Sequence, residues 1–170
     1  VTFQNGLRQD HNLSLSGIKD EVSYYWSLGY TNNNGVIVGD QFKTIRSLLN
    51  LEGKVVSWLS VGLNMQFSNR DESSIPAFWE GVQRNPPWGS MYLADGITMR
   101  ESPTEDLNGG IKNTIYDRFY QDRKRVYNTL INSLFANFKL PLGISYQLTF
   151  APRFQWYQYL NHQSSLHATW

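Results

Sequence analysis

The chain has 170 residues, a formal net charge of +1 at pH 7 and no cysteine. The near balance of charge argues against a protein that binds nucleic acid through bulk positive charge, and the lack of cysteine excludes disulfides and thiolate metal sites. Aromatic residues make up 15% of the chain and charged residues 17%, which favours strands and turns over helices. No apolar run is long enough for a membrane-spanning helix. The first residues carry no signal-peptide pattern, and we expect the chain to be part of a larger protein.

Up to residue 70, apolar and polar residues alternate in runs that are joined by turn-forming segments. Such period-two runs predict strands that have one apolar and one polar face. We expect these strands within about 8–70, with a short turn at 17–21, a long one at 31–42 and a short one at 53–57. The third run is less regular, because Leu48 falls on its polar side.

The clearest alternation is the stretch WLSVGLNMQFSNR at 58–70. In a soluble protein its apolar side would face a core, whereas in a membrane barrel it would face lipid and its polar side would face the lumen. The side predicted to face lipid consists of Leu59, Val61, Leu63, Met65 and Phe67. The side predicted to face the lumen includes Asn64 and Gln66.

The alternation stops between about residues 71 and 124, where we expect a long extracellular loop. Within it, SSIPAFWEGVQRNPP predicts a short helix. Ser73 or Ser74 would cap its start, Pro76 would lie in its first turn, and the Asn85-Pro86-Pro87 run would end it.

A last hairpin is predicted over about 125–160, with a short turn at 139–143. Its second strand separates an apolar side from a polar one. The lipid-facing prediction there comprises Ile144, Leu148 and Phe150, and the lumen-facing prediction comprises Gln147, Arg153 and Gln155. Because proline is poorly tolerated inside a central strand, Pro152 predicts a bulge or an end of regular pairing.

These elements predict an all-β chain, an antiparallel up-and-down meander of about six strands. Short and long connections alternate, and strands of about ten residues end in aromatic side chains. Both features are typical of an outer-membrane β-barrel, with short periplasmic turns and long extracellular loops. The pattern therefore favours part of a larger transmembrane β-barrel over a soluble β-sandwich, although soluble sheets also alternate.

The first part of the chain, from about His11 to Gly96, resembles the barrel of SusC/RagA-type TonB-dependent outer-membrane transporters. The residues that carry the resemblance are Leu15-Ser16-Gly17, Tyr24-Tyr25, Ser27-Leu28-Gly29-Tyr30, Gly35-Val36, Phe42, Leu49-Asn50-Leu51, Trp58-Leu59, Val61-Gly62, Asn64, Pro86-Pro87, Met91-Tyr92 and Asp95-Gly96. Ile18 stands where the family usually has a second glycine, and the loop beyond Gly96 matches no family pattern. We expect residues 1–170 to be a partial barrel domain, without the plug domain and TonB box of a complete transporter.

The resemblance implies a function and a set of partners. A protein of this family imports a large nutrient, a glycan or a peptide oligomer, across the outer membrane of a Bacteroidota-type bacterium. A SusD-like surface lipoprotein covers the barrel, and the TonB complex supplies energy through the plug region. Two other interpretations remain open: a soluble carbohydrate-binding β-sandwich, and an outer-membrane structural or assembly barrel without transport.

The candidate contact residues lie in the long loop, where large aromatics stand among planar polar groups. Such a mixture suits ligand recognition, in which apolar contact is combined with a few orienting polar groups. It also suits packing within the loop, or contact with a partner protein. The candidates are Trp79, Arg84, Asn85, Trp88, Tyr92 and Asp95.

No motif of a known enzyme mechanism occurs, and we expect no catalytic residue, metal or cofactor, and no nucleic-acid partner. The three histidines lack ligand spacing, and the acidic cluster in the loop lacks the spacing of an EF-hand. These residues are His11, His162 and His167, and Glu101, Glu105 and Asp106. The stretch 116–127 mixes aromatics with charge and predicts a strand that extends beyond the membrane, or a loop end. Its basic residues would form a salt-bridged surface or attract lipopolysaccharide phosphates.

Overall fold

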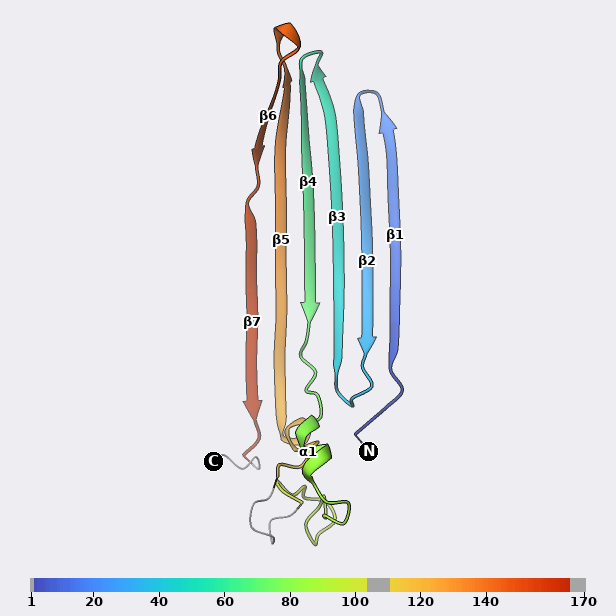
Figure 1. Cartoon of the computed structure of the whole chain (residues 1–170), viewed down its shortest axis with the longest axis vertical. Helices are drawn as coiled ribbons and strands as arrows, with labels where there is room; N and C mark the ends of the chain where they lie inside the picture. The colour runs from blue at the N-terminus through green and yellow to red at the C-terminus, as the bar shows by residue number, and fades with distance from the viewer. Residues whose placement is uncertain (1, 104–110, 166–170) are drawn as a thin grey trace.

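The fold is known from a computed structural model, which describes residues 2–103 and 111–165. The described residues form one antiparallel sheet of seven strands, in the order β1-β2-β3-β4-β5, with β6 and β7 both paired to β5 (Figure 1). The strands are β1 (Leu7–Lys19), β2 (Val22–Asn34), β3 (Gln41–Val56), β4 (Leu59–Asp71), β5 (Gln121–Lys139), β6 (Ser145–Phe150) and β7 (Arg153–Gln163). The helices are α1 (Trp79–Arg84), α2 (Tyr116–Tyr120) and the one-turn η1 (Pro141–Gly143). The predicted all-β antiparallel meander is confirmed.

The sheet has seven strands rather than about six because the last predicted strand is divided at Pro152. Strand β6 ends at Phe150, β7 begins at Arg153, and both pair with β5. At the break, the backbone N–H of Asn132 in β5 donates to the carbonyl of Pro152 (3.1 Å). Proline has no N–H to give to the ladder, so the predicted end of regular pairing at this residue is confirmed.

The short turns after β1, β3 and β5 lie at one end of the sheet, and the longer connections after β2 and β4 lie at the other (Figure 1). Two residues, Asp20 and Glu21, join β1 to β2, and Asp20 has a positive φ of 55°. Ser57 and Trp58 join β3 to β4 beside a register shift at 54–56. These turns are shorter than predicted, because the alternation continues into residues that also favour turns.

The strands also extend further than predicted at the long-connection end. Strand β2 runs through the Asn-rich segment to Asn34, so the loop to β3 spans only residues 35–40. Strand β5 has 19 residues and begins at Gln121. The predicted loop boundary near residue 124 was therefore a few residues late. Cross-strand pairing overrides the weak strand preference of asparagine, aspartate and lysine at these positions.

The helix in the long loop begins later than predicted. Phe78 precedes its first residue and no side chain caps it, so the predicted capping by Ser73 or Ser74 and the first-turn place of Pro76 were wrong. The serines serve the loop instead: the Ser73 backbone N–H donates to Asp71 (2.9 Å), and Ser74 Oγ donates to the Gly39 carbonyl (2.7 Å). The predicted end of the helix, at Asn85, is confirmed. Helix α2 was not predicted.

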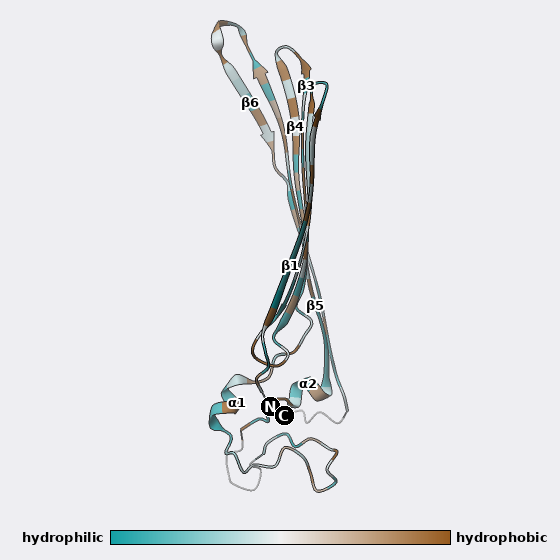
Figure 2. Cartoon of the chain, turned by 90° about the vertical axis from the view of Figure 1, so that its right-hand side faces the viewer, coloured by the Kyte–Doolittle hydropathy of each residue, from teal (hydrophilic) through white to brown (hydrophobic). Residues whose placement is uncertain are grey.

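The sheet is a single twisted layer, with the β4–β5 connection gathered at one end (Figure 2). Among the described residues, the buried hydrophobic side chains are those of Ala77, Met99, Tyr116 and Tyr120, all within that connection. The strands themselves contribute no buried apolar side chain to this described set. A soluble sandwich would cover the apolar face with a second layer, and the described chain supplies none. None of its helices has the length and apolar character needed to cross a bilayer.

Candidate functional site

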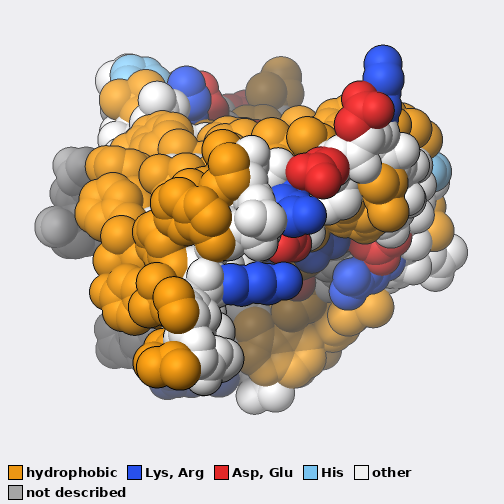
Figure 3. Space-filling view, turned by 90° about the horizontal axis from the view of Figure 1, so that it is seen from above, with side chains coloured by type: hydrophobic (Ala, Val, Ile, Leu, Met, Phe, Trp, Pro, Cys, Tyr) orange, Lys and Arg blue, Asp and Glu red, His pale blue; other side chains and the backbone are white. Residues whose placement is uncertain are grey.

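One face of the sheet carries an apolar belt, which we define as the cross-strand rows that contain Val61, Leu63, Met65 and Phe67. The row through Leu63 also holds Tyr24, Leu51, Leu134 and Phe150. Phe150 is 66% exposed and Leu134 49% exposed, so the belt faces outward rather than into a core. Seen from the short-turn end, hydrophobic side chains gather on one flank of the molecule and charged side chains away from it (Figure 3).

The height of the belt matches a membrane. From Leu59 to Phe67 the chain rises about 27 Å at about 3.4 Å per residue, and a strand tilt near 45° reduces this to roughly 20 Å. The Leu59 row already contains the aromatic rings of Phe138 and Tyr146. Adding the row of His11 and Tyr30 at the other edge brings the total close to the apolar band of about 25 Å that outer-membrane barrels show. Beyond the belt, toward the long connections, the same face becomes polar at Asn32, Lys43 and Asp71.

Aromatic rings mark both edges of the apolar belt. At the short-turn end, Phe138 lies between Trp58 (ring centroids 6.3 Å apart) and Tyr146 (6.0 Å). At the other edge, His11 stacks on Tyr30 (6.3 Å). In outer-membrane barrels, rings with a polar end gather at the two water interfaces.

Two pairs of polar side chains on the belt face hydrogen-bond to each other. The Trp26 indole N–H donates to Ser47 Oγ (3.1 Å), and Asn69 Nδ2 donates to Asn128 Oδ1 (2.7 Å). Pairing of this kind is what an apolar surrounding requires, because an unsatisfied donor there costs free energy.

Of the residues predicted to face lipid, those in β4 and β6 share the belt face. Ile144 is different: it precedes β6, and its carbonyl accepts a hydrogen bond from the Leu140 N–H (2.8 Å) within the turn. Strand β6 therefore begins one residue later than predicted, and the lipid-facing position of Ile144 stays a prediction. The alternating sequence does not show that residues Pro141–Gly143 form a 3₁₀ turn, in which Leu142 and Gly143 have positive φ.

The opposite face of the sheet is predominantly polar and includes every residue predicted to face the lumen. These residues are Asn64, Gln66, Gln147, Arg153 and Gln155. On the same face, Thr31 Oγ1 donates to Asp10 Oδ1 (2.6 Å), and Arg46 Nη2 donates to Thr31 Oγ1 (3.1 Å). The face thus carries a hydrogen-bonded network that suits contact with water or with another polar surface.

The β4–β5 connection folds into a cap on the end of the sheet. The Ala77 N–H donates to the Val38 carbonyl in the β2–β3 loop (2.9 Å), and Phe3 meets Trp79 edge to face with centroids 5.5 Å apart. Gly39 has φ +82°, and a side chain there would collide with the Ile75 carbonyl and Arg118. The glycine therefore allows the cap to lie directly against the β2–β3 loop.

A buried asparagine, Asn113, organises the interior of the cap. Its side chain is 1% exposed and donates to the carbonyls of Met91 (3.3 Å) and Arg100 (3.1 Å), and its Oδ1 accepts from the Ile115 N–H (3.3 Å). Next to it, Met99, Tyr116 and Tyr120 form a small apolar cluster. Sequence reasoning did not single out Asn113, because nothing in its local pattern distinguishes a buried asparagine from a loop one.

The six contact candidates of the cap have different surroundings. Trp88 is 77% exposed, Trp79 45% and Tyr92 40%. Arg84 pairs with Glu80 one helical turn away (2.6 Å). Asn85 Nδ2 donates to the Lys112 carbonyl (3.1 Å), so this residue also holds the cap together.

Asp95 stabilises its own turn. Its Oδ1 accepts from the backbone N–H groups of Ile97 and Thr98, each at 2.9 Å. The Thr98 hydroxyl is the largest influence on this carboxyl, and together with the two N–H groups it lowers the pKa of Asp95 below the ordinary value. Asp95 therefore stabilises the turn in which it lies. Trp88 is the most exposed aromatic of the six candidates.

Three residues of the 116–127 stretch and one residue of the adjacent strand β4 form a group that the sequence analysis did not identify as a site. Arg123, Arg125 and Tyr127 of β5 lie on the polar face, beside Arg70 of β4, whereas Lys124 lies on the belt face. The salt-bridged surface that the sequence favours is present in part, because Arg125 Nε lies 3.9 Å from Glu72 Oε2. The attraction of lipopolysaccharide phosphates stays a prediction. The mixture of aromatic and basic residues was the only feature of the sequence that pointed to this group. The pairing register of the strands determines which of these residues lie on the polar face.

The remaining predictions concern histidines and acids. His11 lies in β1 and His162 in β7, far apart in the sheet order. No group of three or more His, Asp or Glu side chains within 2–103 and 111–165 has the geometry to hold a metal. His167, Glu105 and Asp106 lie outside the described residues.

No family model matches the sequence, and no curated protein matches it. Among solved structures, the chain is similar to a chain of the RagAB peptide importer in its closed-closed state, with a TM-score of 0.64 over 88% of this chain and 17% sequence identity. The likeness covers 18% of that chain, so this chain spans less than a fifth of the length of its structural neighbour. At this identity the likeness shows the fold alone. The shared fold is an antiparallel β-sheet, and the likeness is to part of a chain of that importer.

Proposed function

We propose that the chain forms part of the barrel wall and one external loop of a SusC/RagA-like TonB-dependent transporter in a bacterial outer membrane. The observation that carries the proposal is the apolar belt: the sheet is a single layer that leaves the belt uncovered, and the height of the belt suits a bilayer. The fold likeness to the RagAB peptide importer supports the same interpretation.

The topology gives the segment a direction in this proposal. The short turns after β1, β3 and β5 lie on the periplasmic side, and the folded cap lies outside the cell. The belt faces lipid, and the polar face with Asn64, Gln66 and Gln155 faces the water-filled interior or the plug. The transported cargo is a large nutrient, a glycan or a peptide oligomer. It enters past the cap, where a SusD-like lipoprotein binds, and the TonB complex supplies energy through the plug region.

A soluble carbohydrate-binding module is disfavoured by the same observation. A module of that kind needs a covered core, and the strands of the described chain bury no apolar side chain among themselves. A structural barrel without transport would differ from a transporter only in parts of the protein outside this segment.

The experiment is cell fractionation combined with a growth assay. In the bacterium that produces the protein, we expect the complete protein in detergent-soluble outer membranes, and we expect that disrupting its gene abolishes growth on an oligomeric nutrient but not on its monomers. Recovery in a soluble fraction without detergent would refute the membrane assignment. Outer-membrane recovery without any nutrient phenotype would favour the structural barrel.

A further inference from the structure

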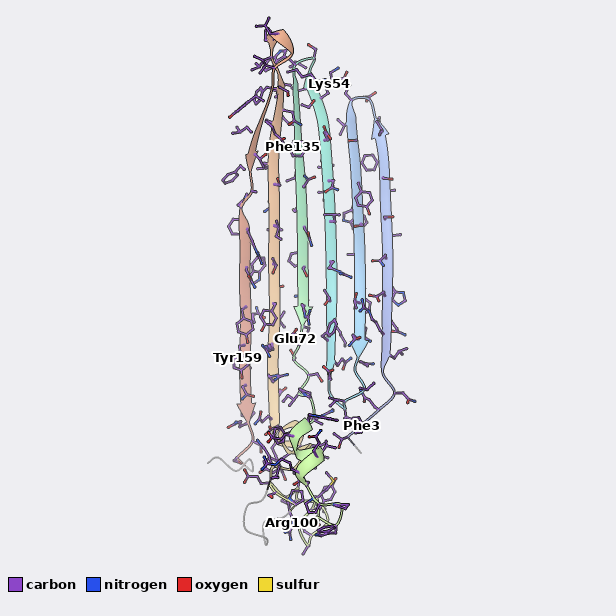
Figure 4. All side chains as sticks on the ribbon, in the orientation of Figure 1. Phe3, Lys54, Glu72, Arg100, Phe135 and Tyr159 are labelled. Carbon is purple, nitrogen blue, oxygen red and sulfur yellow. The ribbon has the colours of Figure 1, made fainter. Side chains whose placement is uncertain are left out.

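The polar face carries an arginine–tyrosine cluster at its cap end, formed by Arg70, Arg123, Arg125, Tyr127 and Tyr157. Arg70, Tyr127 and Tyr157 are direct cross-strand partners on β4, β5 and β7. Arg125 lies one row closer to the cap, opposite Tyr159. In Figure 4, Glu72 and Tyr159 mark this end of the sheet, whereas Lys54 and Phe135 mark the short-turn end. The cluster thus spans three adjacent strands at the mouth of the proposed barrel.

The arginines line a hollow of about 250 Å³, between the end of the sheet and the start of the cap. Its acidic side chains are Glu72 and Asp40, against the three arginines. Glu72 Oε1 lies 2.6 Å from Arg70 Nε, and its Oε2 lies 3.9 Å from Arg125 Nε. One carboxylate is therefore shared by two guanidinium groups, and the hollow keeps a net positive charge. A concave site of one sign focuses its field on an approaching ion.

Neighbouring groups hold the guanidinium groups in place. The Arg70 guanidinium lies over the Phe42 ring (4.4 Å), and Arg125 Nε donates to the Tyr127 hydroxyl (2.9 Å). Arg123 donates to the carbonyls of Glu72 and Ser74, and its buried Nε has no hydrogen-bond partner among the described residues. Preorganised arginines of this kind present planar pairs of N–H donors, the geometry that matches a carboxylate.

Beside the arginines, tyrosine rings continue along β7. Tyr127 stacks on Tyr157 (centroids 4.7 Å apart), and Tyr157 stacks on Tyr159 (6.1 Å). Tyr157 is 48% exposed and Tyr159 57% exposed. The rings offer a flat apolar surface next to the N–H donors of the arginines. A ligand that contacts both would therefore carry an acidic group close to an apolar part.

We propose that this cluster binds acidic peptides, by holding a side-chain or C-terminal carboxylate at Arg70 and Arg125 while neighbouring residues lie along Tyr157 and Tyr159. The inference rests on the proposed transport function and narrows its cargo. A peptide is favoured over a neutral glycan because the cluster presents mostly donors. Guanidinium groups only donate hydrogen bonds, so a carboxylate, which only accepts them, suits the arginines better than a neutral hydroxyl does. The carboxylate of Glu72 is already engaged by arginine.

The test uses the complete transporter in isolated outer membranes and a defined probe. The probe is a mixed proteolytic peptide digest, offered either untreated or after methyl esterification of its carboxyl groups. Retained peptides are counted by mass spectrometry. We expect wild-type membranes to retain the untreated digest about tenfold better than the esterified one, the effect of losing one charge-assisted contact.

Two variants are expected to change the retention of acidic peptides in opposite directions. The double variant Arg70→Gln/Arg125→Gln should lose the preference for free carboxylates. Glu72→Gln, which frees both guanidinium groups of their internal partner, should strengthen retention of acidic peptides. Lys139→Gln removes the same charge at the other end of β5 and should behave as wild type. Heat-modifiable migration checks folding, and if the double variant does not assemble, Glu72→Gln and the single Arg70→Gln variant carry the test.

The outcomes separate the two proposals. Equal retention of both digests, an unchanged preference in the arginine variants, or a preferred neutral oligosaccharide would overturn the acidic-peptide site and leave the transport function standing. Membranes that retain no oligomer above membranes lacking the protein would overturn both.

Discussion

The sheet and the cap are stabilised in different ways, although they belong to one chain. The strands between the short turns and the cap are a single layer that exposes apolar side chains such as Phe150 and Leu134. The cap buries its own small core around Met99 and Tyr120, and Asn113 joins its loop segments by side-chain hydrogen bonds. The sheet therefore depends on its surroundings, which in the proposed barrel are lipid on one face and water or protein on the other, whereas the cap has a small core of its own. Substitutions should have consequences that follow this division.

The largest expected effect contrasts the two faces of β4. Met65 lies in the middle of the apolar belt and Gln66 next to it on the polar face. In the complete protein, the proposed membrane barrel predicts a cost of about 2–4 kcal/mol for Met65→Arg, which would place a charge in the bilayer core, and of about 0–1 kcal/mol for Gln66→Arg. Urea unfolding in lipid vesicles measures both. Equal costs would show that the two faces do not meet different solvents.

A second prediction concerns the interior of the cap. Asn113→Ala removes three side-chain hydrogen bonds from the interior of the cap, at a cost of about 1–3 kcal/mol. Because the cap is stabilised by its own core, limited proteolysis of the loop should accelerate while the heat-modifiable migration of the barrel stays normal. The exposed Trp88→Ala is the matched control. A barrel that fails to assemble in Asn113→Ala would show that the two regions fold as one unit.

A smaller effect is expected from the paired polar groups of the belt. Ser47→Ala removes the acceptor of the Trp26 indole N–H and should destabilise the sheet by about 0.5–1.5 kcal/mol. The same substitution at Ser68, on the polar face, should change little because water can replace its contacts. Urea midpoints compare the two variants. A Ser47→Ala variant as stable as wild type would mean that water reaches the indole.

The smallest effect is a pH dependence within the cap. The pKa of Asp95 is lowered in the folded turn, so the ionised carboxylate stabilises that turn above its unfolded pKa, and this stabilisation is lost as the pH falls through the folded pKa. Protease sensitivity of the 93–98 segment should therefore rise in acid, and Asp95→Asn should remove that dependence. A wild-type segment whose cleavage rate stays flat at acidic pH would contradict this assignment.

The sequence predicted the sheet better than the cap, for a physical reason. Period-two alternation directly encodes which side chains share a face, so the alternation alone was enough to group the residues from Leu59 to Phe67 and the polar set with Gln147 and Arg153. Pro152 marked the division of the last strand because it lacks an N–H. Turn lengths were less predictable, because polar residues such as Asn32 can form part of a strand as readily as part of a turn when a neighbouring strand is present.

The candidate site was predicted only in part. Exposed aromatics such as Trp88 could be selected from composition, but the local task of Asp95 and the burial of Asn113 depend on contacts that the local pattern does not contain. The arginine–tyrosine cluster depends on the register of three strands, which aligns Arg70 with Tyr127 and Tyr157. Single-sequence patterns do not contain that register.

The most direct measurement places a probe on each face of β4. The sequence has no cysteine, so Met65→Cys and Gln66→Cys can each carry one fluorescent label in the complete transporter, reconstituted with lipids that have brominated acyl chains. The account predicts strong quenching of the label at position 65 by the bromolipid and strong quenching at position 66 only by a water-soluble quencher. Equal access of the water-soluble quencher to both positions, without bromolipid quenching at 65, would contradict the claim that the apolar belt faces lipid.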